Sequence, residues 1–169
     1  VNDAPALRAA NIGVALGSGT EVAKEASDLV LLTNSFSVIV SAIEEGRRIV
    51  DNIKKIIAYL LSTSFGELLL VAGAMFAVLP IPLLPAQILW INMLTEGLLN
   101  FAYAFEPKES DIMQRHPKKG YEHGIMTKRM IGFIAIVSLG LGTILFVMYL
   151  LFLNVFEYTL LESRGLLFV

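Results

Sequence analysis

Residues 56–79 read IIAYLLSTSFGELLLVAGAMFAVL and contain a single charged side chain, that of Glu67. A helix rises 1.5 Å per residue, so an apolar run of about 24 residues can cross a bilayer with some tilt. No proline interrupts residues 34–79, and apolar side chains recur at helical spacing through the more polar first half. The sequence therefore predicts one long helix, with a stalk over residues 35–55 and a transmembrane helix over residues 56–79.

The composition of the whole chain agrees with a membrane protein. Of its 169 residues, 56% are hydrophobic and only 17% are charged, whereas about a quarter are charged in soluble domains. The net charge is -2 and the chain has no dense basic tract, which argues against nucleic-acid binding. The absence of cysteine excludes disulfides, thiolate metal sites and cysteine nucleophiles.

Two further apolar runs follow the first. Residues 80–85 read PIPLLP, and the three prolines end the first helix and predict a tight hairpin. A second span is predicted over residues 83–105, where Glu96 is the only charge, and a third over residues 130–156. A polar loop over residues 106–129 separates them. The expected fold class is a membrane α-helical protein with three transmembrane helices.

The distribution of basic residues predicts the orientation. Lysine and arginine concentrate beside the first span and in the 106–129 loop, and only Arg164 lies on the opposite side. Basic loops mark the cytoplasmic side, so the stalk and this loop are expected to be cytoplasmic. The 80–85 hairpin and the 157–169 segment would then be external, and this last segment looks truncated. We expect an integral protein of the plasma (inner) membrane, surrounded by the lipid bilayer.

Residues 1–34 have a different pattern, typical of a soluble α/β piece. A strand is predicted over residues 12–16, a short helix over residues 20–27 and a second strand over residues 29–32. About thirty residues cannot close a hydrophobic core alone. This piece is therefore expected to complete a larger cytoplasmic domain.

Two acidic residues lie deep in predicted spans, where an unpaired carboxylate costs several kcal/mol. Glu67 has Ser64 one turn earlier in its helix. Glu96 has Thr95 beside it and Asn92 one turn before it. The short hairpin makes the two helices antiparallel and places both glutamates at a similar depth. Such an oxygen-rich cluster suits a hard cation or a proton shared by the carboxylates, and polar contacts between protonated glutamates are the alternative.

Several stretches occur in the order and spacing of a known family. Residues 1–5, VNDAP, are similar to the end of a Gly-Asp-Gly-x-Asn-Asp-x-Pro hinge motif, without its Gly-Asp-Gly part. Residues 44–55 are similar to a stalk entering a fifth membrane helix, and residues 90–97, WINMLTEG, to an ion-binding sixth helix. Residues 106–113 are similar to the loop before a seventh helix. The chain resembles the P-type cation-transporting ATPases, most closely their calcium-pump-like group.

The resemblance implies roles for particular residues. Residues 1–34 would be the C-terminal end of an HAD-like phosphorylation domain, with Asn2 and Asp3 near the phosphate and Mg2+. The ligands of the transported cation, expected to be Ca2+, would be Ser64, Glu67, Asn92, Thr95 and Glu96. The intact pump would bind ATP and form an aspartyl phosphate. In the family the phosphorylated aspartate and the nucleotide-binding domain lie upstream, so this chain alone is expected to be inactive and to work with the rest of its own pump chain.

Two departures from the calcium-pump pattern leave the ion open. Calcium pumps usually have asparagine at the position of Ser64 and aspartate at that of Glu96. A P-type pump for protons or a monovalent cation is therefore an alternative. An ion channel or carrier subunit without enzyme activity, or a membrane anchor, is an alternative of another class.

Overall fold

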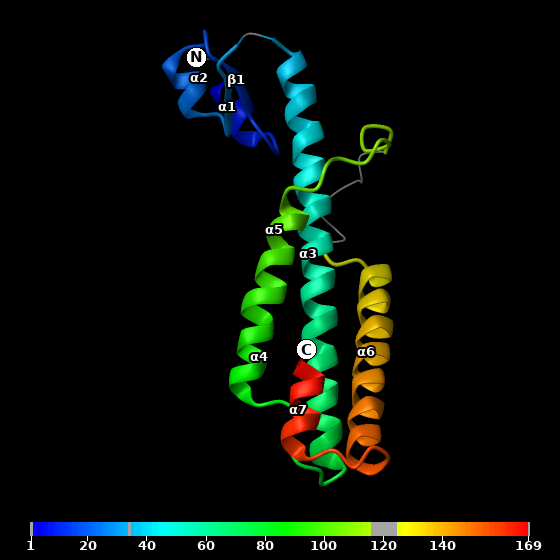
Figure 1. Cartoon of the computed structure of the whole chain (residues 1–169). Coiled ribbons are helices and arrows are strands. Elements are labelled where there is room, and N and C mark those ends of the chain that lie inside the picture. The colour runs from blue at the N-terminus through cyan, green and yellow to red at the C-terminus, as the bar shows by residue number, and fades with distance from the viewer. Residues whose placement is uncertain (1, 34, 116–124, 169) are drawn as a thin grey trace. The chain divides into compact units, whose positions relative to one another are not determined.

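The computed structural model describes residues 2–33, 35–115 and 125–168 (Figure 1). Residues 116–124 of the predicted 106–129 loop lie outside the described residues. The chain divides into two compact units, residues 1–47 and residues 48–169.

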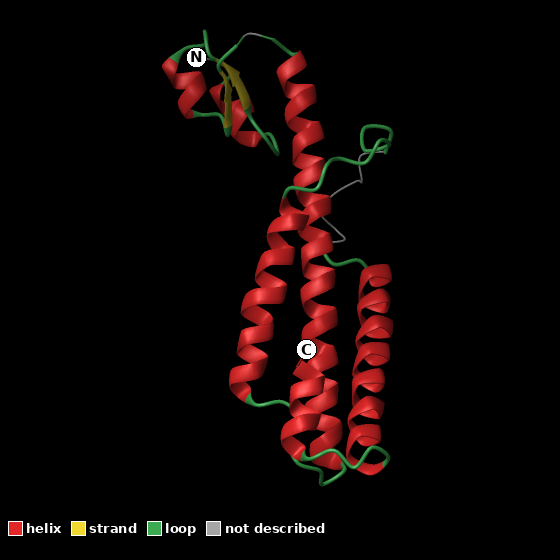
Figure 2. Cartoon of the chain, viewed as in Figure 1, coloured by secondary structure: helices red, strands yellow, loops and turns green. Residues whose placement is uncertain are grey.

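The first unit contains a strand, a helix and a second strand after a short leading helix (Figure 2). The elements are α1 (Ala4–Ala9), β1 (Val14–Leu16), α2 (Glu21–Glu25) and β2 (Leu29–Leu31). Thr20 caps α2, because its hydroxyl oxygen accepts a hydrogen bond from the Ala23 amide at 3.3 Å. The strands are parallel, as a connection through a helix requires, and Ala15 lies opposite Val30.

The hydrophobic core of this unit is small. Ala15, Ala26 and Leu31 are buried, whereas Leu29 and Leu32 are 51% and 92% exposed. Parallel sheets are normally covered on both faces. The exposed leucines are therefore what we expect of two strands that belong to a larger sheet, and the HAD-like assignment remains a prediction.

Helix α3 (Ser37–Phe76) has 40 residues and is about 60 Å long. Beyond it the Leu79 amide donates to the Ala74 carbonyl oxygen at 2.9 Å. Val78 has a φ of 56°, a conformation that valine rarely adopts. This turn and Pro80 end the helix at Phe76, slightly before the predicted residue 79.

The second predicted span, residues 83–105, is helical but not regular. It consists of α4 (Pro85–Ile91), a π-helix η1 (Asn92–Glu96) and α5 (Gly97–Ala104). The wider π turn is rare and frequently occurs at functional sites. Nothing in the sequence predicted it, although it coincides with the proposed ion-binding residues.

Helix α6 (Lys128–Asn154) runs beside α3 on the side away from α5 (Figure 1). Thr127 caps it by accepting from the Met130 amide at 3.2 Å. Within the segment predicted to be external, the structure forms helix α7 (Leu160–Phe168). Its start is a capping box in which Glu162 accepts from the Thr159 amide at 2.9 Å, and Thr159 accepts from the Glu162 amide at 3.3 Å.

Within the described residues, α3 and α6 are long and apolar enough to cross a membrane. The second predicted span is divided into three shorter helical elements, none of which meets that length by itself. The count of three spans therefore remains a prediction.

Candidate cation-binding site

A cavity of about 430 Å³ lies among α3, η1, α6 and α7 in the second unit. Its polar lining consists of Tyr59, Thr63, Glu67, Thr95 and Glu96. The rest of the lining is apolar: Leu70, Leu83, Ile91, Leu141, Leu145, Met148, Leu166, Leu167 and Phe168. Both glutamates predicted from the sequence therefore line the same, mostly apolar cavity.

Glu96 is the more deeply buried of the two and is only 7% exposed. The Thr63 hydroxyl donates a short hydrogen bond to Glu96 Oε1. A single neutral donor does not compensate for the loss of water around a carboxylate. A bound cation would compensate for that loss, which makes Glu96 a candidate cation ligand.

Glu67 and Glu96 lie close enough for their charges to interact. The side chain of Asn92 is hydrogen-bonded to Glu67. Asn92 Oδ1 is buried and has no hydrogen-bond partner within the ranges that the structure describes. An amide oxygen is a good ligand for a hard cation, and a bound ion would satisfy this buried acceptor.

The structure treats the two predicted hydroxyl ligands differently. Both are exposed, but Thr95 lines the cavity and Ser64 does not. Thr63 takes the place expected for Ser64. Residues three and four positions before Glu67 both lie on its side of a helix, so the spacing could not choose between them. Of the predicted residues, Glu67, Thr95 and Glu96 line the cavity, and Asn92 does not line it but contacts Glu67.

The oxygen atoms of this group suit a divalent cation in number. Two carboxylates, two hydroxyls and one amide supply about seven oxygens, within the six to eight that Ca2+ takes. No cluster of three or more histidine, cysteine, aspartate or glutamate residues suited to a metal occurs in the described parts of the chain. Among the residues that line the cavity, Glu67 and Glu96 are the two that carry a carboxylate.

Tyr59 was missed by the sequence analysis. It lines the cavity, and its ring packs against Tyr103 of α5 with a centroid distance of 5.8 Å. An aromatic residue within an apolar run carries no sign of such a role. Only the position of Tyr59 on the helix, one turn before Thr63 and on the same face, would have indicated that it lines the cavity.

Asn2 and Asp3 lie in the first unit, immediately before α1, and both side chains are exposed. Asp3 makes no side-chain hydrogen bond that caps α1. Both side chains therefore lie at the surface of the first unit.

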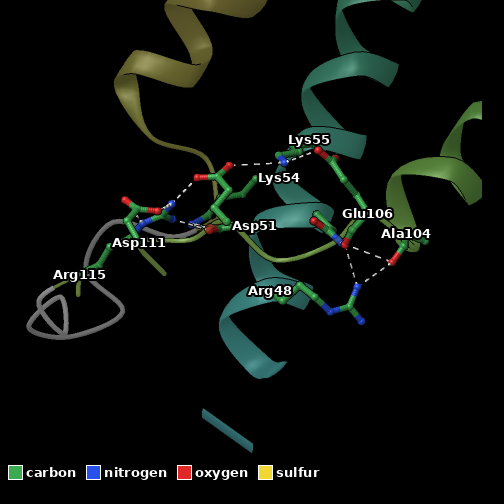
Figure 3. Close-up of polar contacts among 10 residues, drawn as sticks. Arg48, Asp51, Lys54, Lys55, Ala104, Glu106, Asp111 and Arg115 are labelled. Carbon is green, nitrogen blue, oxygen red and sulfur yellow. Dashed lines mark hydrogen bonds and ion pairs between the residues drawn. The ribbon is translucent and has the colours of Figure 1, made fainter. Parts of the chain in front are cut away.

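A second polar group connects α3 to the segment after α5 (Figure 3). Arg48 Nη1 and Asn52 Nδ2 donate to the Glu106 carbonyl oxygen at 3.1 and 2.9 Å. Both also reach the Ala104 carbonyl oxygen at 3.4 Å. Carbonyl groups at the end of a helix lack partners inside the helix. The α3 side chains therefore cap α5.

Ion pairs extend this group. Lys55 Nζ lies 2.9 Å from Glu106 Oε1 and 3.5 Å from Glu109 Oε1. The hydrogen bond to Glu106 raises the pKa of Lys55 above 10.5. Arg115 lies 2.9 Å from Asp111 Oδ1 and lowers the pKa of Asp111 below 3.8. The raised pKa of Lys55 stabilises the folded protein at pH values below the ordinary lysine pKa. The lowered pKa of Asp111 stabilises it at pH values above the ordinary aspartate pKa. Both contributions are therefore present at neutral pH.

We expect Asn52→Ala to lower the free energy of unfolding by about 1–3 kcal/mol, because it removes a buried donor to two carbonyl oxygens. Asn52 is only 4% exposed. The matched control is Asn154→Ala, whose amide donates to the Leu150 carbonyl oxygen at 3.0 Å on the exposed surface. Thermal unfolding in detergent measures both variants. Equal midpoints for the two would contradict the importance of the Asn52 contacts.

Comparison with known proteins places the chain in a family. Residues 80–169, more than half of the chain, match the family model described as "Cation transporting ATPase, C-terminus". The chain belongs to the cation-transporting ATPase family. The resemblance predicted from the motifs is therefore confirmed.

Individual relatives carry related names. The "Calcium-transporting ATPase" of Bacillus subtilis is 52% identical over 124 residues, which are 71% of this chain and 14% of that protein. The "Probable cation-transporting ATPase F" of Mycobacterium tuberculosis is 54% identical over 119 residues, 70% of this chain and 13% of that protein. The chain thus matches about one seventh of the length of these ATPases. Together with α3 and α6, membership in this family makes it an integral membrane protein.

Proposed function

We propose that the intact protein is an ATP-driven P-type pump that transports a cation through the cavity containing Glu67 and Glu96. One observation carries this proposal: two carboxylates from neighbouring helices line the same cavity in a cation-transporting ATPase. The hydroxyls of Thr63 and Thr95 and the amide of Asn92 complete the proposed ligand set. Ser64, which the resemblance implied, is replaced in it by Thr63.

Calcium is the proposed cation. The oxygen-only ligand set supports it, as does the name of the Bacillus subtilis relative. The proximity of Glu67 and Glu96 also favours a second candidate. Two adjacent carboxylates readily share one proton, and a pump for protons or a monovalent cation would use the same cavity.

The phosphoryl-transfer site is proposed to include Asn2 and Asp3. Their exposed amide and carboxylate supply the hard oxygen donors that Mg2+ prefers, so they fit part of a magnesium site. ATP would supply the phosphoryl group, and Mg2+ would balance its charge. Asp3 would help to hold the metal, and Asn2 would donate a hydrogen bond to a phosphate oxygen.

We propose three transmembrane spans in the plasma membrane, with α1 and the segment after α5 in the cytoplasm. The basic residues near Lys55 and Lys128 support this orientation. Helix α3 contains both the proposed cytoplasmic stalk and Glu67, without interruption. A movement of the stalk during phosphorylation would therefore reach the cavity through a single helix.

The test is phosphorylation by labelled ATP of the full-length pump that contains this segment. We expect an acid-stable, hydroxylamine-sensitive phosphoenzyme that requires micromolar Ca2+. Phosphorylation that ignores Ca2+ but responds to pH or to a monovalent cation would establish the second candidate. The 169-residue chain alone is expected to form no phosphoenzyme, and ATP hydrolysis by it would contradict the proposal.

A further inference from the structure

The 80–85 hairpin cannot satisfy its own carbonyl groups. Three of its six residues are prolines, which have no amide hydrogen to donate. A carbonyl group without an amide partner in its own turn can accept a hydrogen bond from a side chain. Two side chains that are distant in sequence supply such bonds: Tyr149 Oη donates to the Pro80 carbonyl oxygen at 2.7 Å, and Arg164 Nε donates to the Ile81 carbonyl oxygen at 3.0 Å.

Tyr149 is held in position by its surroundings. It is 0% exposed and forms a hydrophobic cluster with Leu70, Ala74 and Leu83. A phenol hydroxyl among apolar side chains is costly unless it has a partner. The Pro80 carbonyl provides that partner. The same hydrogen bond therefore satisfies both the Tyr149 hydroxyl and a carbonyl group of the hairpin.

The same segments form one end of the cavity. Leu83 follows Ile81 by two residues, Met148 immediately precedes Tyr149, and Leu166 follows Arg164 by two residues. All three of these flanking residues line the cavity. The two hydrogen bonds therefore join the hairpin to α6 and to α7, close in sequence to these three lining residues.

We propose that Tyr149 and Arg164 form an external latch, which closes the hairpin end of the cavity and must open when the cation leaves. Both are positioning residues that act on the backbone of the hairpin. The latch is external in the proposed orientation of the chain, and its role in cation release rests on the proposed function.

The test measures access to Leu83 in the full-length pump. Leu83 is 3% exposed, and these 169 residues contain no cysteine. With cysteines elsewhere replaced, Leu83→Cys is labelled in vesicles by a membrane-impermeant thiol reagent. Because Tyr149→Phe keeps the ring but removes the donor, we expect about tenfold faster labelling, the effect of losing one buried hydrogen bond. Arg164→Gln removes the donor of the exposed hydrogen bond to Ile81 and is also expected to make labelling faster.

Tyr158→Phe is the matched control. Tyr158 is 40% exposed and its ring stacks on Phe156. We expect it to leave the labelling rate unchanged. Equal labelling rates in the Tyr149→Phe, Arg164→Gln and unsubstituted backgrounds would overturn the latch.

A second measurement separates a latch from a general folding defect. With Leu83 intact, Tyr149→Phe should leave the cytoplasmic Ca2+ concentration for half-maximal phosphorylation within about twofold of the unsubstituted pump. Faster labelling together with a large loss of cytoplasmic affinity would also overturn the latch, since both ends of the cavity would then be disturbed. A pump that forms no cation-dependent phosphoenzyme at all would contradict the proposed function. The labelling rates would still decide whether Tyr149 and Arg164 close the cavity.

Discussion

Glu96→Gln in the full-length pump is expected to raise the cation concentration for half-maximal phosphorylation by about a hundredfold, close to 3 kcal/mol of binding free energy. The substitution keeps the size and one oxygen of the side chain, so the packing around this 7% exposed residue is retained. It removes one of the two negative charges that line the cavity. Of the cavity-lining residues in this chain, Glu67 would then be the remaining carboxylate near a divalent cation. Phosphoenzyme formation over a range of cation concentrations measures the shift.

Three further variants make this result specific. Glu157→Gln changes an exposed glutamate outside the cavity and is expected to have no effect. Thr63→Val removes the donor to Glu96 and should weaken cation binding about tenfold. Ser64→Ala should leave cation binding unchanged, because Ser64 does not line the cavity. If Ser64→Ala weakened cation binding and Thr63→Val did not, Ser64 and not Thr63 would be the ligand. Normal cation dependence in Glu96→Gln would contradict the proposed cation site.

Sequence reasoning works for α3 because the relevant signals are local. The absence of proline between residues 34 and 79 permits one helix, and its apolar second half identifies a span. The prolines that follow end the helix, and the structure has no helix again until Pro85. The strands around residues 14 and 29 are also local patterns. These features depend on backbone conformation and side-chain type along short stretches of chain.

The features that the sequence missed depend on packing between distant segments. The π-helix at Asn92 replaces one hydrogen-bonding register by another of similar energy, and no residue type demands it. The pairing of Arg115 with Asp51 joins residues that are 64 positions apart. Whether Thr63 or Ser64 lines the cavity depends on how α3 is rotated about its axis relative to η1. Each of these becomes visible only when the helices are assembled.

Helix α6 provides a second prediction with a large effect, because one of its glycines permits close contact with α3. A Cβ atom on Gly142 would lie 2.6 Å from Leu69 Cβ and 3.0 Å from the Gly66 carbonyl oxygen. Neither atom is the end of a flexible side chain, so the helices would have to separate. Small residues permit such contacts between membrane helices.

Gly142→Ala is therefore expected to destabilise the protein by about 1–3 kcal/mol, the usual cost of overpacking a close contact. The higher helix propensity of alanine, worth about 1 kcal/mol, offsets part of this loss. Gly140→Ala is the matched control on the same helix, since a Cβ atom there would meet no described atom within 4 Å. That substitution gains the propensity without the clash and should raise the thermal midpoint slightly. Because the two variants differ only in position, a lower midpoint for Gly140→Ala than for Gly142→Ala would show that α3 and α6 do not pack through Gly142 in the membrane.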